Sequence, residues 1–259
     1  MRPPPAGPVR PETLYQRNRQ TPDRLNNSQR RTYDLLRSTL QHGRGSQYLV
    51  EGELSDALSA SRNTVRAVLQ QLAKEGMVTR SPKRGTHSEP QILLQLTDIA
   101  PVEEYGSAGE KVHTQLRTLE YQTLGCPQVV RERLELPMGW SVLMIESLMT
   151  QADGAPLGLS TSYIALSPDD AHDVIVDEPD PIVFLEKNMG VQIAGSRTTI
   201  SATAADVQSA QLVGVELGAP MIFLEDVLED ENGRAWALFQ SRLRSDRIAF
   251  SACAQRKPA

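Results

Sequence analysis

The stretch SASRNTVRAVLQQLAKEGMVTRSPKRGTH, which runs from Ser59 to His87, decides the fold of the front part of this chain. Apolar residues recur within it at the spacing of an amphipathic helix that buries one face. Ser61 can cap that helix, because its hydroxyl can accept hydrogen bonds from the free amides of the first turn. Gly76 can end it in the left-handed conformation that glycine adopts easily. The residues expected on the buried face are Val65, Val68, Leu69 and Leu72.

A second face of the same helix carries Arg62, Arg66 and Gln70, each four residues from the next. A shorter helix is predicted over residues 52–58, and only residues 59–61 separate the two. A short helix, a three-residue turn and a longer helix form the helix-turn-helix pattern, in which the second helix enters the DNA major groove. An ordinary helical subdomain with a solvated charged face is the alternative interpretation.

Two extended segments, residues 77–80 and 86–87, follow the helix, and Ser81-Pro82-Lys83-Arg84-Gly85 joins them. Pro82 favours a turn and Gly85 can supply a positive φ. The pattern therefore predicts a β-hairpin with Lys83 and Arg84 at its tip. With a further helix expected over residues 28–43, the segment 28–88 is predicted to be a winged helix-turn-helix domain.

This segment resembles the DNA-binding domain of GntR-type bacterial regulators. The matching residues are Ser61-Arg62-Asn63-Thr64-Val65-Arg66, then Glu75-Gly76, then Arg84-Gly85-Thr86. It departs from the family at Gly52, where members usually have an arginine, so one common DNA contact is expected to be missing. The candidate DNA-binding residues are Ser61, Arg62, Asn63, Thr64, Arg66, Lys83, Arg84, Gly85 and Thr86.

Charge divides the chain into a basic front and an acidic body. Residues 1–90 contain 15 Lys and Arg against 8 Asp and Glu, and the remaining residues contain 12 against 24. Such a chain is suited to bind a polyanion with one end only. Residues 1–27 hold six prolines and five arginines and few large apolar residues. We expect them to form a disordered basic arm, either contacting DNA or without a role.

Several other classes of protein are not expected. No apolar run approaches the roughly 18 residues that span a bilayer, and no leader sequence is seen, so a cytoplasmic protein is predicted. The two cysteines lie far apart and suggest no disulfide framework, and the four histidines show no metal-ligand spacing. No paired carboxylates or nucleophile–base arrangement is visible. We therefore expect neither a cofactor, nor a metal, nor an enzyme.

From Gln91 onward the pattern becomes that of alternating strands, with two hairpin turns at Asp153-Gly154 and Asn232-Gly233. Short helices lie near them, so an α+β domain around an antiparallel sheet is predicted. Strands are expected at 91–96, 112–121, 140–151, 157–165, 198–204, 221–228, 235–244 and 248–252, and helices at 128–134, 181–189 and 206–213.

The order of motifs in residues 91–254 resembles the UTRA effector-binding domain, which follows the winged helix in the HutC branch of GntR regulators. This resemblance implies a fold related to chorismate lyase, a homodimer and a pocket for a small molecule. The motifs are Leu134-Glu135-Leu136-Pro137-Met138-Gly139, Ala152-Asp153-Gly154-Ala155-Pro156-Leu157, Ser162-Tyr163-Ile164 and Asp246-Arg247-Ile248-Ala249-Phe250.

Charged residues that bind sugar phosphates in other UTRA domains are missing here. Leu148 and Thr150 replace an arginine pair, and Ser160, Ala237 and Leu243 replace two glutamates and a tyrosine. Phosphate recognition needs charge-assisted donors, so a more neutral, more apolar ligand is expected. The candidate effector residues are Thr150, Ser160, Ser162, Tyr163, Arg197 and Arg242; plain strand residues and surface ion pairs are the alternatives.

The sequence thus predicts a transcriptional regulator, most often a repressor in this family, that binds a pseudo-palindromic operator as a homodimer under the control of a small molecule. A constitutive DNA-binding regulator with a degenerate effector pocket is the alternative.

Overall fold

The computed structural model describes residues 29–254 except 43–46, 83, 90, 103–105, 108–109, 112–113 and 170–175. The predicted basic arm, the predicted cap Ser28 and the wing residue Lys83 lie outside the described residues. The chain divides into two compact units between Gln91 and Ile92. We refer to them as unit 1 and unit 2 and describe each by itself.

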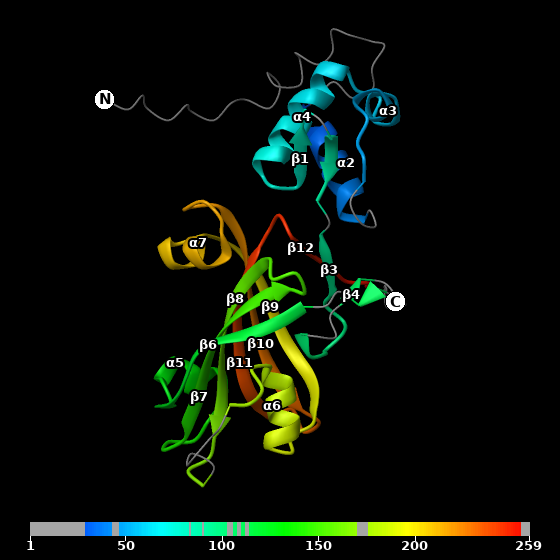
Figure 1. The fold of residues 1–259 in the computed structure, drawn as a ribbon. Helices are drawn as coiled ribbons and strands as arrows, with labels where there is room; N and C mark the ends of the chain where they lie inside the picture. The colour runs from blue at the N-terminus through cyan, green and yellow to red at the C-terminus, as the bar shows by residue number, and fades with distance from the viewer. Residues whose placement is uncertain are drawn as a thin grey trace, which may run out of the picture. The chain divides into compact units, whose positions relative to one another are not determined.

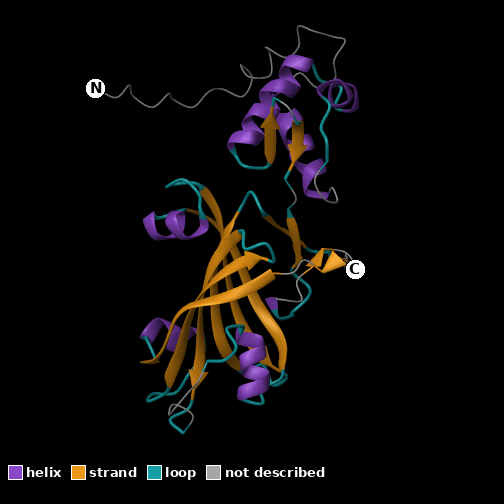
Figure 2. Ribbon diagram, viewed as in Figure 1, coloured by secondary structure: helices purple, strands orange, loops and turns teal. Residues whose placement is uncertain are grey.

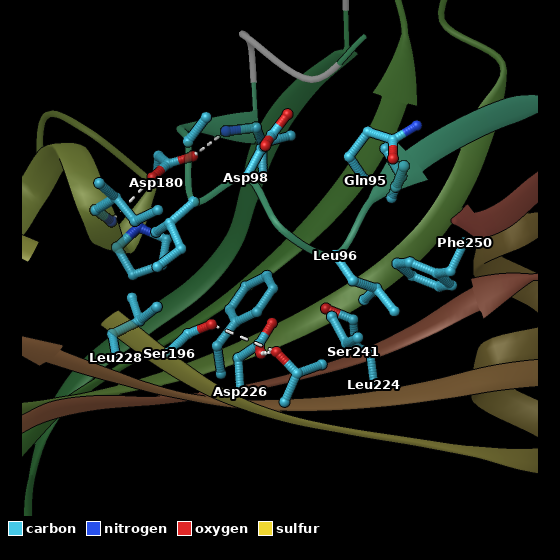
Figure 3. Close-up of a pocket in the computed structure, with 18 of the residues that line it drawn as sticks. Gln95, Leu96, Asp98, Asp180, Ser196, Leu224, Asp226, Leu228, Ser241 and Phe250 are labelled. Carbon is cyan, nitrogen blue, oxygen red and sulfur yellow. Dashed lines mark hydrogen bonds between the residues drawn. The ribbon is translucent and has the colours of Figure 1, made fainter. Parts of the chain in front are cut away.

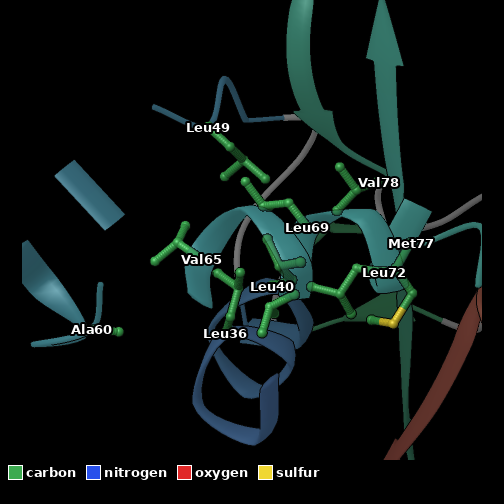
Figure 4. Close-up of a cluster of buried hydrophobic side chains, with 10 residues drawn as sticks. Leu36, Leu40, Leu49, Ala60, Val65, Leu69, Leu72, Met77 and Val78 are labelled. Atoms are coloured by element: carbon green, nitrogen blue, oxygen red, sulfur yellow. The ribbon is translucent and has the colours of Figure 1, made fainter. Parts of the chain in front are cut away.

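The described part of unit 1 contains three helices and a two-stranded antiparallel hairpin around one apolar core (Figures 1 and 4). Leu36 and Leu40 of the helix over residues 29–42 pack against the buried face of the helix over residues 62–74, and Met77 and Val78 close the core from the strand side. The elements are α2 (Gln29–His42), α3 (Glu51–Ala57), α4 (Arg62–Lys74), β1 (Val78–Ser81) and β2 (Gly85–Ser88).

Helix α4 has the predicted ends and the predicted buried face. The amide of Thr64 donates to the Ser61 hydroxyl over 3.0 Å, and Gly76 has a φ of 76°. The four apolar residues expected on the inner face, Val65 among them, are all 0% exposed. The helix is therefore held by one side and leaves the other to solvent.

The hairpin of unit 1 turns at a glycine that no other residue can replace easily. Gly85 has a φ of 77°. A Cβ added there would lie 2.4 Å from Cε2 of Tyr48, and Tyr48 forms a β-bridge with His87. Both the backbone conformation and the close ring explain the glycine.

Unit 2 is built on a large sheet (Figure 2). The sheet has six strands in the order β6-β7-β8-β11-β10-β9. All neighbouring strands in it are antiparallel. The two predicted hairpins are confirmed, with φ values of 85° at Gly154 and 74° at Gly233. The strands are β6 (Thr114–Gly125), β7 (Ser141–Gln151), β8 (Pro156–Leu166), β9 (Ile193–Ala204), β10 (Pro220–Asp230) and β11 (Ala235–Arg244).

Both faces of this sheet are covered. Helices α5 (Gln128–Arg133) and α7 (Val207–Val213) pack on one face. Helix α6 (Pro181–Asn188) packs on the other face, together with a parallel pair made of β3 (Ile92–Gln95) and β12 (Ile248–Ser251). Two short strands, β4 (Gly106–Ser107) and β5 (Glu110–Lys111), form a separate pair.

Strand β9 begins at Ile193, earlier than the predicted residue 198. Apart from Ile193, the added residues are small or polar and show no apolar alternation. They are extended because they pair with β10, where Ser196 lies opposite Leu228 and Gly195 opposite Glu229. Backbone pairing with a partner distant in sequence therefore set this boundary. Among the described helices, none combines the length and the apolar character needed to cross a bilayer.

Candidate nucleic-acid interface and ligand cavity

The solvent side of α4 carries the predicted base-contacting residues. Arg62, Asn63 and Arg66 are exposed, on the first turns of the helix. The hydroxyl of Ser61 lies 2.8 Å from that of Thr64 and also caps the helix, so both side chains are partly engaged within the protein. The free amides and the positive end of the helix dipole favour a phosphate at this point.

The carboxylate of Glu51 lies among these arginines, and the sequence analysis did not predict it. Arg66 donates to Glu51 through Nε, over 3.2 Å, and through Nη2, over 3.0 Å. Arg80 donates to the other oxygen of Glu51 over 3.1 Å. The hydrogen bond from Arg66 is the main reason why the pKa of Glu51 is lowered. Glu51 is thus charged at neutral pH and holds two guanidinium groups in place.

Gly52, where the related family usually has an arginine, lies beside Arg62. A Cβ added at Gly52 would be 3.8 Å from Nη2 of Arg62. The Arg62 guanidinium therefore reaches over the start of α3. A cation remains at this place on the surface, although it comes from α4.

Of the predicted DNA-binding residues in the wing that the structure describes, Arg84 is an exposed cation, whereas Gly85 and Thr86 determine the conformation of the hairpin. Arg84 is exposed, and its carbonyl lies 2.6 Å from Nε2 of His87. The Thr86 side chain is only 8% exposed, and its carbonyl accepts from the amide of Leu49 over 2.8 Å. Gly85 and Thr86 therefore give the hairpin its form, and Arg84 is the side chain available to a polyanion.

Unit 2 contains a cavity between the sheet and the elements that cover its α6 side (Figure 3). It holds about 730 Å³ of empty space when its open mouth is included, and about 60 Å³ can hold the centre of a water molecule. A single water molecule needs roughly 10–15 Å³ of space for its centre. The inner part of the cavity is several times larger than that and suits a small ligand. Its wall is mostly apolar and includes Leu94, Leu96, Met149, Leu224, Leu228, Phe239, Leu243 and Phe250.

Three carboxylates and several hydroxyls interrupt this apolar wall. Asp180 is 3% exposed and caps α6, and burial raises its pKa despite three backbone hydrogen bonds. Asp226 accepts a hydrogen bond from the Thr198 hydroxyl, and burial raises its pKa as well. Ser241 is 1% exposed and its hydroxyl oxygen has no hydrogen-bond partner. Asp98 is exposed near the mouth.

The predicted effector residues are not brought together. Ser160 and Ser162 are buried on the cavity side of the sheet, opposite Ser241 and Phe239, but do not line the cavity. Tyr163 lies on the other side and packs with the core beneath α5. Thr150 follows a β-bulge at Met149 and does not line the cavity either.

The two candidate arginines are on the far side of the sheet from the cavity, each in an ion pair. Arg197 lies 2.9 Å from Glu229, and Arg242 lies 3.6 Å from Asp206. Successive strand residues point to opposite faces, so the neighbours Thr198 and Ser241 face the cavity instead. Sequence reasoning had no means of choosing the face, because apolar residues cover both.

Comparison with known families identifies both units. A model described as "UTRA domain" matches residues 107–249, and one described as "Bacterial regulatory proteins, gntR family" matches residues 29–87. The transcriptional repressor PhnF of Mycolicibacterium smegmatis is 24% identical over 80% of this chain and 84% of its own. The repressor NagR of Bacillus subtilis is 24% identical over 77% of this chain and 82% of its own.

A solved structure shares the fold. The crystal structure of PhnF from Mycobacterium smegmatis matches with a TM-score of 0.58 and 23% identity, covering 87% of this chain and all of that one. At this level of identity the match supports the architecture alone.

Proposed function

The chain belongs to the gntR-family bacterial regulators that carry a UTRA domain, and on this premise we propose that it represses transcription until a small molecule enters the cavity of unit 2. The family consists of DNA-binding regulators rather than enzymes. The repressing sign of regulation is inferred from relatives such as PhnF and NagR, whose names describe them as repressors.

The observation that carries the DNA-binding half is the exposed arginine face of α4. Arg62 and Arg66, both exposed, would donate to guanine O6 and N7 in the major groove. Asn63 and Thr64 would contact bases or phosphates at the helix start, and Arg84 would neutralise phosphate from the wing. Glu51 orients Arg66 for this contact, since it holds that guanidinium through two nitrogens.

A homodimer would place two such helices on the two halves of a pseudo-palindromic operator. The acidic composition of residues 91–259 supports this arrangement, because that part of the chain is repelled by DNA and is free to hold the two copies together. Half-site spacing would then follow from the geometry of the dimer.

The cavity is connected to the DNA-binding unit along the chain. β3 contributes Leu94 and Gln95 to the cavity wall, and only three residues separate it from the end of β2. A ligand that changes the position of β3 would therefore also move the segment that connects unit 2 to unit 1. Affinity for operator falls if the ligand prefers the dimer state with the wrong spacing, and DNA must reciprocally weaken the ligand.

The test begins with genomic mapping of bound sites, followed by binding titrations on the operator found. Arg62→Ala should cost about 1–3 kcal/mol per half-site and relax base preference at one position. Lys74→Ala, which removes an exposed cation at the far end of α4, serves as the control and should leave preference intact. Retained sequence preference in Arg62→Ala would rule out this assignment.

The alternative, a constitutive regulator with a degenerate pocket, predicts a different outcome. The mostly apolar cavity with an unpartnered hydroxyl favours a ligand-responsive protein. A protein whose operator affinity no small molecule changes would support the constitutive alternative.

A further inference from the structure

The wall of the cavity in unit 2 has an unusual charge balance. Among its described lining residues there are three carboxylates, Asp98, Asp180 and Asp226, and no lysine or arginine. A phosphate or carboxylate ligand would meet repulsion here and no cationic donor from that set. The cavity can therefore discriminate between ligands by their charge. Which ligands it prefers depends on the hydrogen bonds that each carboxylate already makes within the protein.

Asp180 is committed to the fold. Its Oδ1 accepts from the amides of Ile182 and Val183 over 2.9 and 3.3 Å, and its Oδ2 accepts from the amide of Val102 over 2.6 Å. These bonds tie the start of α6 to the chain segment after β3. Asp180 therefore has little acceptor capacity left for a ligand.

Asp226 is in a different situation. One oxygen, Oδ1, accepts from the Thr198 hydroxyl, while for Oδ2 no hydrogen bond is found within the described part of the chain. Its strand also carries Leu224 and Leu228 on the same side, both of which line the cavity. This partly buried carboxylate therefore has one hydroxyl donor and, among the described residues, no cation, although a carboxylate withdrawn from water usually has a cation or several donors.

Ser241 supplies a second polar group beside it. The residue lies opposite Leu224 in the β10–β11 pair, while Asp226 lies opposite Phe239. Asp226 and Ser241 are thus diagonal neighbours on one face of the sheet, as Figure 3 shows. The Ser241 hydroxyl has no partner although the residue is almost wholly buried, and such a group normally has one.

We propose that the effector is a small amine with an apolar body, whose ammonium group donates to Asp226 and to the Ser241 hydroxyl. An ammonium group carries only donors, which matches a carboxylate and a hydroxyl oxygen that both need one. The apolar body lies against Leu224, Phe239, Leu243 and Phe250. This ligand class rests on the proposed function, since it concerns the same cavity.

The experiment compares matched probes on the full chain. Isopentylamine, isopentanol and 4-methylpentanoate share a branched apolar body and differ in the head group; inorganic phosphate and glucose 6-phosphate represent anionic ligands. Binding is measured by calorimetry and thermal shift at pH 7. Isopentylamine is expected to bind more tightly than the alcohol, while the three anions should not bind in the cavity.

Two variants locate the contact. Asp226→Asn keeps the acceptor for Thr198 and should weaken isopentylamine about tenfold to a hundredfold, as expected for a charged hydrogen bond. Glu225→Gln removes the same charge one residue away on the opposite face and should leave amine binding unchanged. Ser241→Ala should weaken the amine less than Asp226→Asn does.

The possible results separate this inference from the function itself. Tighter binding of 4-methylpentanoate or a phosphate, no binding of the amine, or equal amine binding in Asp226→Asn would overturn the ligand class. Selective operator binding would in those cases leave the DNA-binding proposal intact. Conversely, an amine that binds through Asp226 without changing operator affinity would support the ligand class and contradict the proposed control of DNA binding.

Discussion

Glu51 is the residue in unit 1 whose role is least expected at a surface that binds DNA. Its carboxylate repels phosphate, yet it pairs with Arg66 and Arg80. The ion pairs are exposed enough that they contribute little to stability. Under the proposed mode of DNA binding they would orient the guanidinium groups, so that Glu51 would lower affinity for DNA while raising the preference for operator.

Glu51→Gln should therefore strengthen binding to random DNA and reduce the preference for operator. The loss of one negative charge should steepen the dependence of log K on log salt concentration by up to about one unit. Anisotropy titrations with operator and random duplexes at several salt concentrations measure both. Glu53→Gln, an exposed carboxylate on the same helix, is the control; equal loss of preference in the two variants would contradict a role for pairing.

Asp226 is a residue whose charged form lowers the stability of the folded protein, and a role in binding a ligand would explain why it is present. Its pKa is raised in the folded protein, mainly by burial. The stability that such a group contributes is complete below its unfolded pKa of about 3.9 and is lost as pH rises through the folded pKa. Burial therefore makes the charged form of Asp226 less favourable in the ligand-free folded protein than in the unfolded chain.

Asp226→Asn should raise the melting temperature of unit 2 at pH 7, and this gain should shrink as pH falls toward 4. Thermal unfolding of both proteins across that range measures the effect. Glu225→Gln is the control, because that carboxylate lies on the opposite face of the sheet and is paired there, with Arg133 over 3.2 Å and with the Gln240 amide over 2.8 Å; it should not show a gain that shrinks as pH falls. A gain that stays constant with pH would show that burial of charge is not the cause.

At the scale of elements, the wing hairpin depends on Gly85 for two separate reasons. Gly85→Ala places a side chain at positive φ, which costs about 1–2 kcal/mol, and also brings Cβ against Tyr48. Gly154→Ala is a matched comparison, since that glycine has a φ of 85° and no atom within 4 Å of an added Cβ.

We expect Gly85→Ala to lower the stability of unit 1 by more than Gly154→Ala lowers that of unit 2, and to weaken DNA binding. Denaturant titration of each unit provides the numbers. Adding Tyr48→Ala to Gly85→Ala should recover part of the difference. If it recovers none, contact with the ring is not responsible.

For the molecule as a whole, the short connection between β2 and β3 links the two units along the chain. Inserting Gly-Ser-Gly-Ser after Gln91 lengthens it while leaving both units unchanged. Under the proposed dimeric mode of binding, the natural protein should lose at least about tenfold in affinity when half-sites are moved by half a helical turn, and the insertion variant should lose less.

Gel-shift titrations on operators with altered spacers measure this tolerance. The same insertion in the hairpin turn at Asp153-Gly154 is the control and should keep the natural spacing dependence. Identical spacing dependence in both variants would mean that the connection does not set the distance between the winged units.

The sequence by itself determined the features that depend on near neighbours along the chain. The cap at Ser61, the buried face of α4, the glycine turns and the two hairpins all follow from spacings of a few residues, and the structure has them all. Both domains could be recognised from the sequence for the same reason, since their family motifs are short and follow one another in a fixed order along the chain.

Only the tertiary structure decided which distant residues meet. Glu51 reaches Arg66 and Arg80, which lie 15 and 29 residues away, and the strand order brings Thr198, Asp226 and Ser241 to one side of a sheet. The reason is physical: a shift of one residue reverses the face of every side chain in a strand. Because this sheet is packed on both faces, alternation alone could not tell which side would hold the cavity.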